Sequence, residues 1–548
     1  MSLKKNQIFE TTIENLSSDG SGVAHSPDGE TVFIPGAAPG DEARVRIVKD
    51  CKRYAFGILD EVLTPSPDRI PVDCAVAGPC GGCSLRHLDY AAELRAKQEN
   101  VADAFARIGG LDVPVLPIVG SPEVNRYRNK VQFPVGVDKS GKPCIGFYAG
   151  RTHRIVPCPD CRLQPGVLNE IGNALCAFFA EKGIQPYSEE TGRGLVRHIF
   201  LRRGAHSGQI MVCLVCTRAK LPSAEELCTR LKAQFAEITT ILLNVNAKNT
   251  NVILGTETHT LYGPGYIEDT LCGVPVQLGP LSFYQVNTLA AEQLYGIAAQ
   301  YAQLTPDDLL LDLYCGMGTI GLSMAAHCRE LIGVEIVPEA IESAKANAAR
   351  MGADVAAKSR FFCADAGQAA TRLAAEGLHP DIVMLDPPRK GCDEATLSAV
   401  VRMSPRRVVY VSCNPATAAR DAAWLEQNGY HAEKVQPVDL FPRTRHCEAV
   451  LLLTKLHVER HIEVDVSMDE LDVTAAESKA TYNEIRDYVW EHHQLKVSNL
   501  YIAQVKQKYG IIERENYHKA KNENAKQPQC PKEKEDAIVE ALKHFQMI

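Results

Sequence analysis

The sequence predicts a multidomain α/β protein built around a doubly wound, mostly parallel sheet. Three observations favour this fold class. Short alternating apolar segments fill residues 1–63, strand-like and helical segments alternate through residues 275–456, and the pattern beyond residue 457 is charged and helical. With 548 residues, 45% of them hydrophobic, the chain can bury more than one core. We therefore expect four domains, at residues 1–63, 64–274, 275–456 and 457–548.

The first domain should be a small antiparallel β-barrel. Segments such as ETVFIPG and EARVRIV alternate apolar and polar residues, and Asp19-Gly20 and Asp28-Gly29 punctuate the pattern as turns. The proline-rich run TPSP at residues 64–67 marks its end.

The second domain should be a mixed α+β domain with a cysteine-rich insert. It contains strand-like stretches such as VQFPVGV and QIMVCLVC. The chain has 19 cysteines and no apolar signal-peptide block near its start, so metal ligation or catalysis is a better interpretation than a disulfide framework. A Cys-x2-Cys pair with further cysteines nearby can hold zinc or an iron–sulfur cluster, and the spacing does not separate these two.

The third domain should be the doubly wound sheet. Its apolar segments are LLLDLYC, LIGVEIV, RFFCADA, DIVMLD, RVVYVSC and AVLLLTK, and helical stretches separate most of them. In such sheets, ligands bind beyond the carboxyl ends of the strands. The residues that follow each strand are therefore the candidate site residues.

A cofactor site is indicated where the first two strands end. Gly316 and Gly318 would let the backbone approach a ligand, although a glycine-rich turn can equally be only a tight connection. Glu335 ends the next strand, where a carboxylate can accept hydrogen bonds from both hydroxyls of a ribose, which favours an adenosine-containing cofactor. Asp365 could reach the adenine, or it is simply an exposed loop residue. Asp386 precedes two prolines that stiffen its loop.

A nucleophile and a base follow later in the sheet. Cys413 comes directly after RVVYV; most cysteines are small buried hydrophobes, but this one lies at a strand end beside the cofactor site. Glu448 precedes the strand AVLLL and is the candidate general base, with a plain surface glutamate as the alternative.

These residues lie in stretches that resemble one family. FYQVN, DLYCGMGTIGL, DPPRKG, VSCNPATAARD and FPRTRHCEAV span most of residues 280–450 and resemble the uracil-5 RNA methyltransferases of 23S ribosomal RNA or transfer RNA. The resemblance implies a Rossmann-like domain that uses S-adenosylmethionine, with Cys413 as nucleophile and Glu448 as base. It implies four cofactor-site residues: Gln285, Tyr314, Glu335 and Asp386.

The expected reaction begins when the Cys413 thiolate attacks carbon 6 of uracil. Carbon 5 then becomes nucleophilic enough to take the methyl group from a sulfonium. Carbon 5 still carries its hydrogen, so Glu448 must remove this proton before the cysteine can leave.

The resemblance extends to the N-terminal barrel, which is similar to an RNA-binding TRAM domain, and to the cysteine-rich insert. It favours a [4Fe–4S] cluster over zinc. The expected ligands are Cys74, Cys80, Cys83 and Cys161, and Cys158 would be a spare thiol that departs from the family pattern.

RNA is the expected partner, although the net charge of −8 is unusual for a nucleic-acid binder. Local basic clusters interleaved with tyrosine and histidine suit phosphate contacts and base stacking, while any single cluster can be only a solvated face. The candidate residues are Arg126, Arg128, Lys130, Arg202 and Arg203. The TRAM-like barrel and the cysteine cluster favour 23S ribosomal RNA over transfer RNA.

The remaining expectations concern the ends of the chain and the rival functions. We expect a cytoplasmic monomer without a membrane span, because no stretch of roughly 18 apolar residues occurs. Helices are expected near residues 478–492, 498–509 and 532–545, the second capped by Ser498 and stopped by Gly510. Methylation of an exocyclic amine would usually use an Asn-Pro-Pro-aromatic loop, and a non-catalytic RNA-binding protein would not need Cys413 and Glu448 together.

Overall fold

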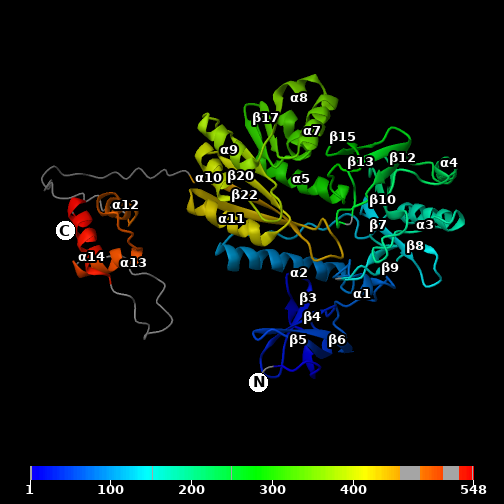
Figure 1. Cartoon of the computed structure of the whole chain (residues 1–548), viewed down its shortest axis with the longest axis horizontal. Coiled ribbons are helices and arrows are strands. Elements are labelled where there is room, and N and C mark those ends of the chain that lie inside the picture. Colours follow the sequence, from blue (N-terminus) through cyan, green and yellow to red (C-terminus); the bar gives the residue numbers. More distant parts are fainter. Residues whose placement is uncertain (1–2, 151, 249, 457–481, 510–529, 546) are drawn as a thin grey trace. The chain divides into compact units, whose positions relative to one another are not determined.

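The computed structural model describes residues 3–150, 152–248, 250–456, 482–509, 530–545 and 547–548 (Figure 1). It divides into two compact units, Met1–Val458 and Glu459–Ile548. Among the described residues, none of the helices combines the length and the apolar character that crossing a membrane would require.

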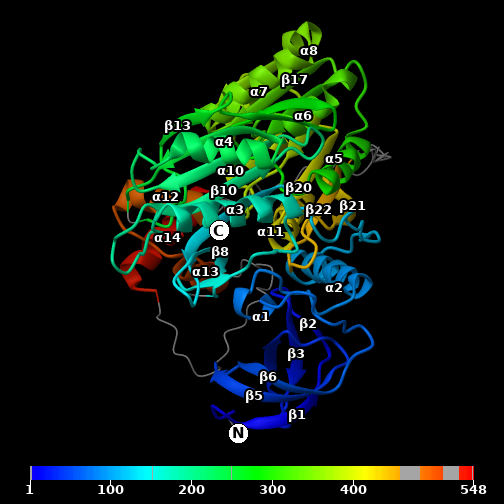
Figure 2. The same ribbon diagram turned by 90° about the vertical axis from the view of Figure 1, so that its right-hand side faces the viewer.

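A six-stranded sheet forms the N-terminal segment, with the order β1-β5-β6-β4-β3-β2 (Figure 2). Its strands are β1 Ile8–Thr12, β2 Asn15–Leu16, β3 Ser21–His25, β4 Thr31–Pro35, β5 Glu42–Asp50 and β6 Tyr54–Thr64. The alternation turns one apolar face inward, where Val32, Ile34 and Val45 are fully buried. The prediction of purely antiparallel pairing is wrong at one place: β6 lies between β5 and β4, and it pairs with β4 in parallel.

Short helices connect this sheet to the next. They are α1 Ala77–Cys80, α2 Tyr90–Asp103 and the π-helix η1 Ala104–Gly109, which continues α2. Asp89 caps α2 by accepting a hydrogen bond from the amide of Ala92.

A seven-stranded sheet follows, with the order β13-β12-β11-β10-β7-β8-β9. Its strands are β7 Lys130–Val137, β8 Pro143–Tyr148, β9 Ile155–Pro157, β10 Val196–Arg203, β11 Ile210–Cys216, β12 Ile238–Val245 and β13 Glu257–Tyr262. Helices α3 Gly166–Glu181 and α4 Ala224–Gln234 cover it and share its apolar core (Figure 2). The hairpin of β14 Ile267–Leu271 and β15 Val274–Leu278 leads to helix α5 Thr288–Ala302.

The third sheet is the predicted doubly wound sheet, with the order β18-β17-β16-β19-β20-β22-β21. Its strands are β16 Leu309–Leu313, β17 Glu330–Glu335, β18 Ser359–Cys363, β19 Ile382–Leu385, β20 Arg407–Ser412, β21 Tyr430–Val438 and β22 Glu448–Lys455. The first five in spatial order are parallel, and β22 runs antiparallel to both of its neighbours.

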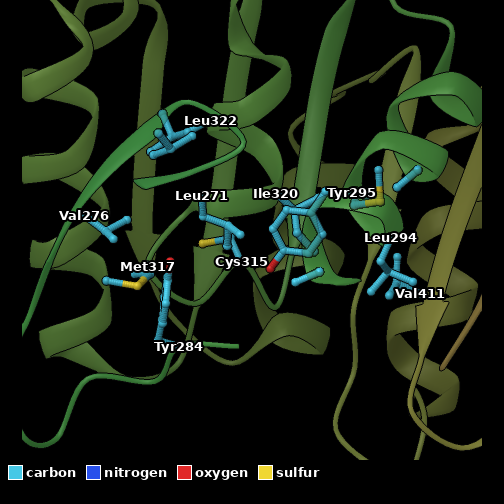
Figure 3. Close-up of a cluster of buried hydrophobic side chains, with 14 of the residues drawn as sticks. Leu271, Val276, Tyr284, Leu294, Tyr295, Cys315, Met317, Ile320, Leu322 and Val411 are labelled. Carbon is cyan, nitrogen blue, oxygen red and sulfur yellow. The ribbon is translucent and has the colours of Figure 1, made fainter. Parts of the chain in front are cut away.

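Helices cover both faces of this sheet, so its strands are apolar on both sides. The helices are α6 Thr319–Met324, the 3-10 helix η2 Ala325–His327, α7 Pro338–Met351, α8 Ala353–Lys358, α9 Ala366–Ala375, α10 Glu394–Met403 and α11 Pro415–Gln427. One apolar core joins the sheet to α5, α6, α7 and the β14–β15 hairpin, and a second joins it to α9, α10 and α11. Figure 3 shows the first core, in which the ring of Tyr295 lies beside Ile320.

The described part of the second unit contains helices α12 Tyr482–His493, α13 Asn499–Lys508 and α14 Lys532–His544. They enclose a small core of their own that includes Ile485, Val489 and Ile538. Ser498 caps α13 as predicted, by accepting a hydrogen bond from the amide of Tyr501. The expected stop at Gly510 and residues 457–481 of the predicted extension lie outside the described residues.

Candidate active site

The candidate nucleophile and base meet because β22 runs antiparallel to β20. Cys413 follows the carboxyl end of β20, whereas Glu448 begins β22. Ser412 pairs with Ala449 across these strands, so the residues next to them emerge at the same edge of the sheet. Asp386 follows β19, the other neighbour of β20, and lies at this edge too.

The thiol and the two carboxyl groups influence one another there. Burial raises the pKa of Cys413, and the charges of Glu448 and Asp386 raise it further. Arg389 opposes this rise through its charge and through a hydrogen bond to the sulfur. The guanidinium of Arg389 is therefore the group that can stabilise the thiolate form of Cys413.

The loops that carry these residues are tied together. Asn414 donates from its side-chain amide to the backbone carbonyl of Arg389 at 3.0 Å, and the Thr417 hydroxyl donates to the same oxygen at 3.4 Å. Asn414 also caps helix α11 through the amide of Ala416. The turn after β20 therefore fixes the Arg389 backbone beside Cys413.

Three carboxyl groups line this part of the sheet, of which Asp312 and Glu448 are buried and Asp386 is partly buried. Burial raises the pKa of Asp386 to about 7. It raises the pKa of Glu448 to about 8, with a further contribution from the charge of Asp386 and an opposing one from Arg389. Burial also raises the pKa of Asp312 to about 8. Such groups can hold or release a proton near neutral pH, as acid–base catalysis requires.

The glycine-rich turn after β16 packs against Glu335. The Gly316 amide donates to Glu335 Oε2 at 3.2 Å, and the Val337 amide donates to Oε1 at 2.9 Å. Gly318 has a φ of 79°, and a side chain there would meet the Ala344 Cβ at 3.1 Å. Glycine suits this position because of the positive φ and because the turn approaches helix α7 so closely.

The other three predicted cofactor residues, Tyr314, Asp365 and Gln285, make different kinds of contact. Tyr314 adopts a φ of 65° and places its hydroxyl 3.3 Å from the Thr396 hydroxyl. Asp365 is partly buried and caps helix α9 by accepting from the Gln368 amide at 3.1 Å, so its contact with the adenine stays a prediction. The Gln285 side chain is hydrogen-bonded to the hydroxyl of Tyr295, which the charge of Asp386 also reaches.

Two neighbouring residues were missed by the sequence argument. Arg389 lies inside the DPPRKG motif, but only the aspartate and the prolines were considered there. Phe283 opens the FYQVN motif, and 71% of its surface is exposed. The signal available in the sequence was the position of Phe283, two residues before Gln285 in the same motif. The structure adds that the side chain is exposed, whereas large aromatic side chains are usually buried.

The predicted RNA-binding cations need correction. Arg202 is 1% exposed and donates to the backbone carbonyls of Gly279 at 2.8 Å and Ser282 at 2.7 Å, so it cannot reach a phosphate. Arg126 is held by the carbonyls of Cys161 and Gln164 and by Asp160.

The other three predicted cations differ in their surroundings. Burial lowers the pKa of Lys130 to about 8, with the charge of Arg202 adding to the effect. Arg128 and Arg203 are partly exposed, so they stay available to a ligand.

The predicted cluster cysteines approach one another without forming a metal site. Burial raises the pKa values of Cys80 and Cys83, and the charge of Cys161 raises both further. A hydrogen bond from Cys158 lowers the pKa of Cys161 to about 6. Cys74 also interacts with Cys80. Within the described residues, however, no three His, Cys, Asp or Glu side chains are grouped so that they could hold a metal ion.

Comparisons with known proteins agree with this geometry. The family model described as tRNA (Uracil-5-)-methyltransferase matches residues 207–456, and the TRAM domain model matches residues 3–59. An uncharacterized RNA methyltransferase of Halalkalibacterium halodurans is 43% identical over 452 residues, which cover 82% of this chain and 98% of the relative. Another, from Clostridium tetani, is 40% identical over 452 residues, with coverage of 82% and 97%.

One solved structure covers most of the chain. It is the Pyrococcus abyssi tRNA (uracil-54, C5)-methyltransferase in complex with S-adenosyl-L-homocysteine, with a TM-score of 0.65 and 26% identity. The match covers 81% of this chain and 100% of that chain.

Proposed function

This chain belongs to the uracil-5 RNA methyltransferase family, and we propose that it methylates carbon 5 of a uridine in RNA through a covalent bond between Cys413 and carbon 6. The observation that carries the proposal is the convergence of a thiol, a buried carboxyl group and a guanidinium at one sheet edge. Cys413, Glu448 and Arg389 supply them, and Ser412–Ala449 pairing holds the two strands in register.

The donor would be S-adenosylmethionine, whose sulfonium supplies an electrophilic methyl group when it is bound. The residues fit such a ligand. Asp312 Oδ1 is buried and has no hydrogen-bond partner among the described residues. The Gly316–Gly318 turn lies close to Glu335, and Asp386 offers a partly buried carboxyl group to a cation.

The proposed reaction forms and breaks one bond to the protein. The Cys413 thiolate, stabilised by Arg389, attacks carbon 6 and pushes electron density onto carbon 5, which would take the methyl group as the methyl–sulfur bond of the donor breaks and leaves a neutral thioether. Glu448 then takes the proton from carbon 5, the carbon 5–carbon 6 double bond re-forms, and the carbon 6–sulfur bond breaks to return the thiolate. Glu448 loses its proton to solvent before the next cycle.

Two variants separate the halves of this reaction. Cys413→Ala should abolish methylation and leave no protein–RNA adduct. Glu448→Gln should methylate but not release, so a methylated RNA should stay bound to Cys413 on a denaturing gel. Cys363→Ala is the control, because Cys363 is an exposed cysteine that ends β18, the edge strand at the far side of the same sheet from β20 and β22. Normal turnover by Glu448→Gln, or an adduct on another cysteine, would contradict the proposal.

We favour 23S ribosomal RNA as the substrate. The TRAM match and the cysteine-rich insert support this choice, because the resemblance associates both with the ribosomal RNA members. Transfer RNA is the second candidate, favoured by the Pyrococcus abyssi structure, whose name specifies a tRNA uracil. Mass spectrometry of 23S rRNA and tRNA from a deletion strain would show which RNA loses 5-methyluridine.

A separate proposal concerns the insert, and no step of the reaction depends on it. The family resemblance supports a [4Fe–4S] cluster on Cys74, Cys80, Cys83 and Cys161, and the cysteine spacing is compatible with it. As placed, these thiols do not form a metal site, so binding would require them to move together. Protein purified without oxygen should contain iron and sulfide, lost in Cys161→Ser and kept in Cys158→Ser. Zinc, or neither metal, would contradict the cluster.

A further inference from the structure

A buried lysine connects helix α2 to the chain that leads into Glu448. Lys97 is 1% exposed, and its ammonium group donates three hydrogen bonds. The acceptors are Glu93 Oε1 at 2.7 Å, Asp439 Oδ1 at 2.8 Å and the backbone carbonyl of Phe441 at 3.2 Å. Burial lowers the pKa of Lys97, but the charges of Asp439 and Glu93 more than offset this, so the lysine stays charged.

Asp439 is held from its other side as well. Its Oδ2 accepts from the Tyr90 hydroxyl at 2.9 Å, and that hydroxyl accepts from the Ser121 amide at 2.7 Å. The Asp439 amide donates to the Val119 carbonyl at 2.9 Å. The start of the loop at residues 439–447 is therefore fixed by α2 and by the segment that follows it.

The middle of the same loop is held by Arg443. Its amide donates to Glu93 Oε1 at 2.7 Å, and its guanidinium donates to the Leu88 carbonyl at 2.8 Å. Its own carbonyl accepts from the Leu85 amide at 3.1 Å. Arg443 has a φ of 69°, a conformation that a non-glycine residue keeps only where its surroundings enforce it.

Holding the loop at residues 439–447 with buried charges costs desolvation free energy. Burying Lys97 with Glu93 and Asp439 removes three charges from water, and apolar residues of similar volume would often be at least as stable. Hydrogen bonds to fixed atoms do, however, set the position of a backbone more narrowly than apolar packing does. The loop held in this way ends at Glu448.

We propose that Lys97 is a positioning residue for the removal of the carbon 5 proton. It fixes Asp439 and Phe441, and thereby places the loop at residues 439–447 so that Glu448 faces carbon 5. Lys97 does not touch the substrate. The inference rests on the proposed function, because it assumes that Glu448 is the base.

The test uses the full-length enzyme with two RNAs. RNA that contains 5-fluorouridine should trap the enzyme after methyl transfer, since fluorine cannot leave as a cation, so trapping reports attack and transfer but not proton removal. Lys97→Met should trap 5-fluorouridine RNA within about twofold of the wild-type rate. With uridine RNA it should turn over roughly tenfold more slowly and accumulate the methylated adduct, because a misplaced base slows only proton removal. Lys97→Arg should restore part of the turnover.

Two further variants keep the test decisive. Tyr90→Phe removes one hydrogen bond to Asp439 and should show the same pattern more weakly, which covers the case in which Lys97→Met does not fold. Lys345→Met is the matched control, since Lys345 forms an exposed helical pair with Glu342. If trapping and turnover fell together in proportion to a lower melting temperature, or if no adduct accumulated with uridine RNA, the positioning role would be overturned. If the wild type formed no adduct with 5-fluorouridine RNA, the proposed function itself would fail.

Discussion

The charge of Asp386 raises the pKa of Glu448, so the two carboxyl groups at the end of β19 and the start of β22 do not ionise independently. Both have pKa values near the working pH of an enzyme, about 7 for Asp386 and about 8 for Glu448. Because a general base must be ionised before it can accept a proton, the fraction of competent enzyme should follow Glu448.

Activity should therefore rise with pH. At saturating RNA and donor, kcat should increase roughly tenfold per pH unit up to about pH 8 where proton removal limits turnover, because kcat follows the ionisations of the enzyme–RNA complex. Ionisation of Cys413, whose pKa is also raised, would make the rise steeper. Initial rates from about pH 6 to about pH 9 at constant ionic strength would measure it. A profile that is flat over this range would contradict Glu448 as the base.

Neutral substitutes at the same positions should stabilise the enzyme. Each carboxyl group has a higher pKa in the folded protein than in the unfolded chain, where it is about 4. Its contribution to the stability of the folded state is therefore fully present below pH 4, and it is lost as the pH rises through the folded-state pKa values of about 7 and about 8. Asp386→Asn and Glu448→Gln should thus each raise stability by about 1–3 kcal/mol at pH 8.5 and by little at pH 4.5. Thermal melts at the two pH values would measure this, with Glu376→Gln as an exposed control. Equal shifts in melting temperature at pH 4.5 and pH 8.5 would show that the stabilisation does not come from the titration of these carboxyl groups.

Adjacent arginines on β10 should behave differently. Arg202→Ala removes the hydrogen bonds to Gly279 and Ser282, which precede the Gln285 loop. It should lower the melting temperature and weaken binding of the donor, with the salt dependence of RNA binding unchanged. Arg203→Ala should reduce the slope of log affinity against log salt by about one, because it would remove one phosphate contact. RNA titrations at several salt concentrations would measure both slopes of log affinity against log salt. A lower slope for Arg202→Ala would show that the Arg202 side chain reaches RNA.

Phe283 should contact a base. Phe283→Ala should weaken RNA binding by about 1–3 kcal/mol, the usual contribution of one aromatic stacking contact. The melting temperature should hardly change, because the side chain is 71% exposed. Leu281→Ala is the control on the same loop, where the leucine is 68% exposed and cannot stack. Equal loss of affinity in both variants would indicate a general effect of the loop rather than stacking.

The doubly wound sheet could be predicted because each of its strands is recognisable from its own run of apolar residues. Every residue of Leu309–Leu313 is buried, and such a run next to a helical pattern has few other interpretations. Cys413, Glu335 and Asp386 could be proposed because each follows or ends a strand of this kind. The parallel pairing of β4 with β6 could not be predicted, since it depends on which strands become neighbours in the folded sheet.

Other residues depend on partners that the local sequence does not reveal. Arg202 and Arg203 are chemically identical neighbours, and only the assembled sheet shows that one faces inward. Lys97 looks like an ordinary helical lysine, because Asp439 is 342 residues away along the chain. The family resemblance likewise predicted a set of cysteine ligands, but it could not give the distances between their sulfur atoms.

The position of β22 also bears on biosynthesis. This strand lies between β20 and β21, although it is made after both of them. While a ribosome is still translating the preceding residues, β20 and β21 have a gap between them and cannot complete the sheet. Chains usually fold from the N-terminus as they emerge, so the thiol of Cys413 is exposed to solvent before Glu448 arrives. β22 is the last strand among the described residues, and it both closes the sheet and completes the catalytic pair, so a chain that ends before it has the nucleophile but not the base.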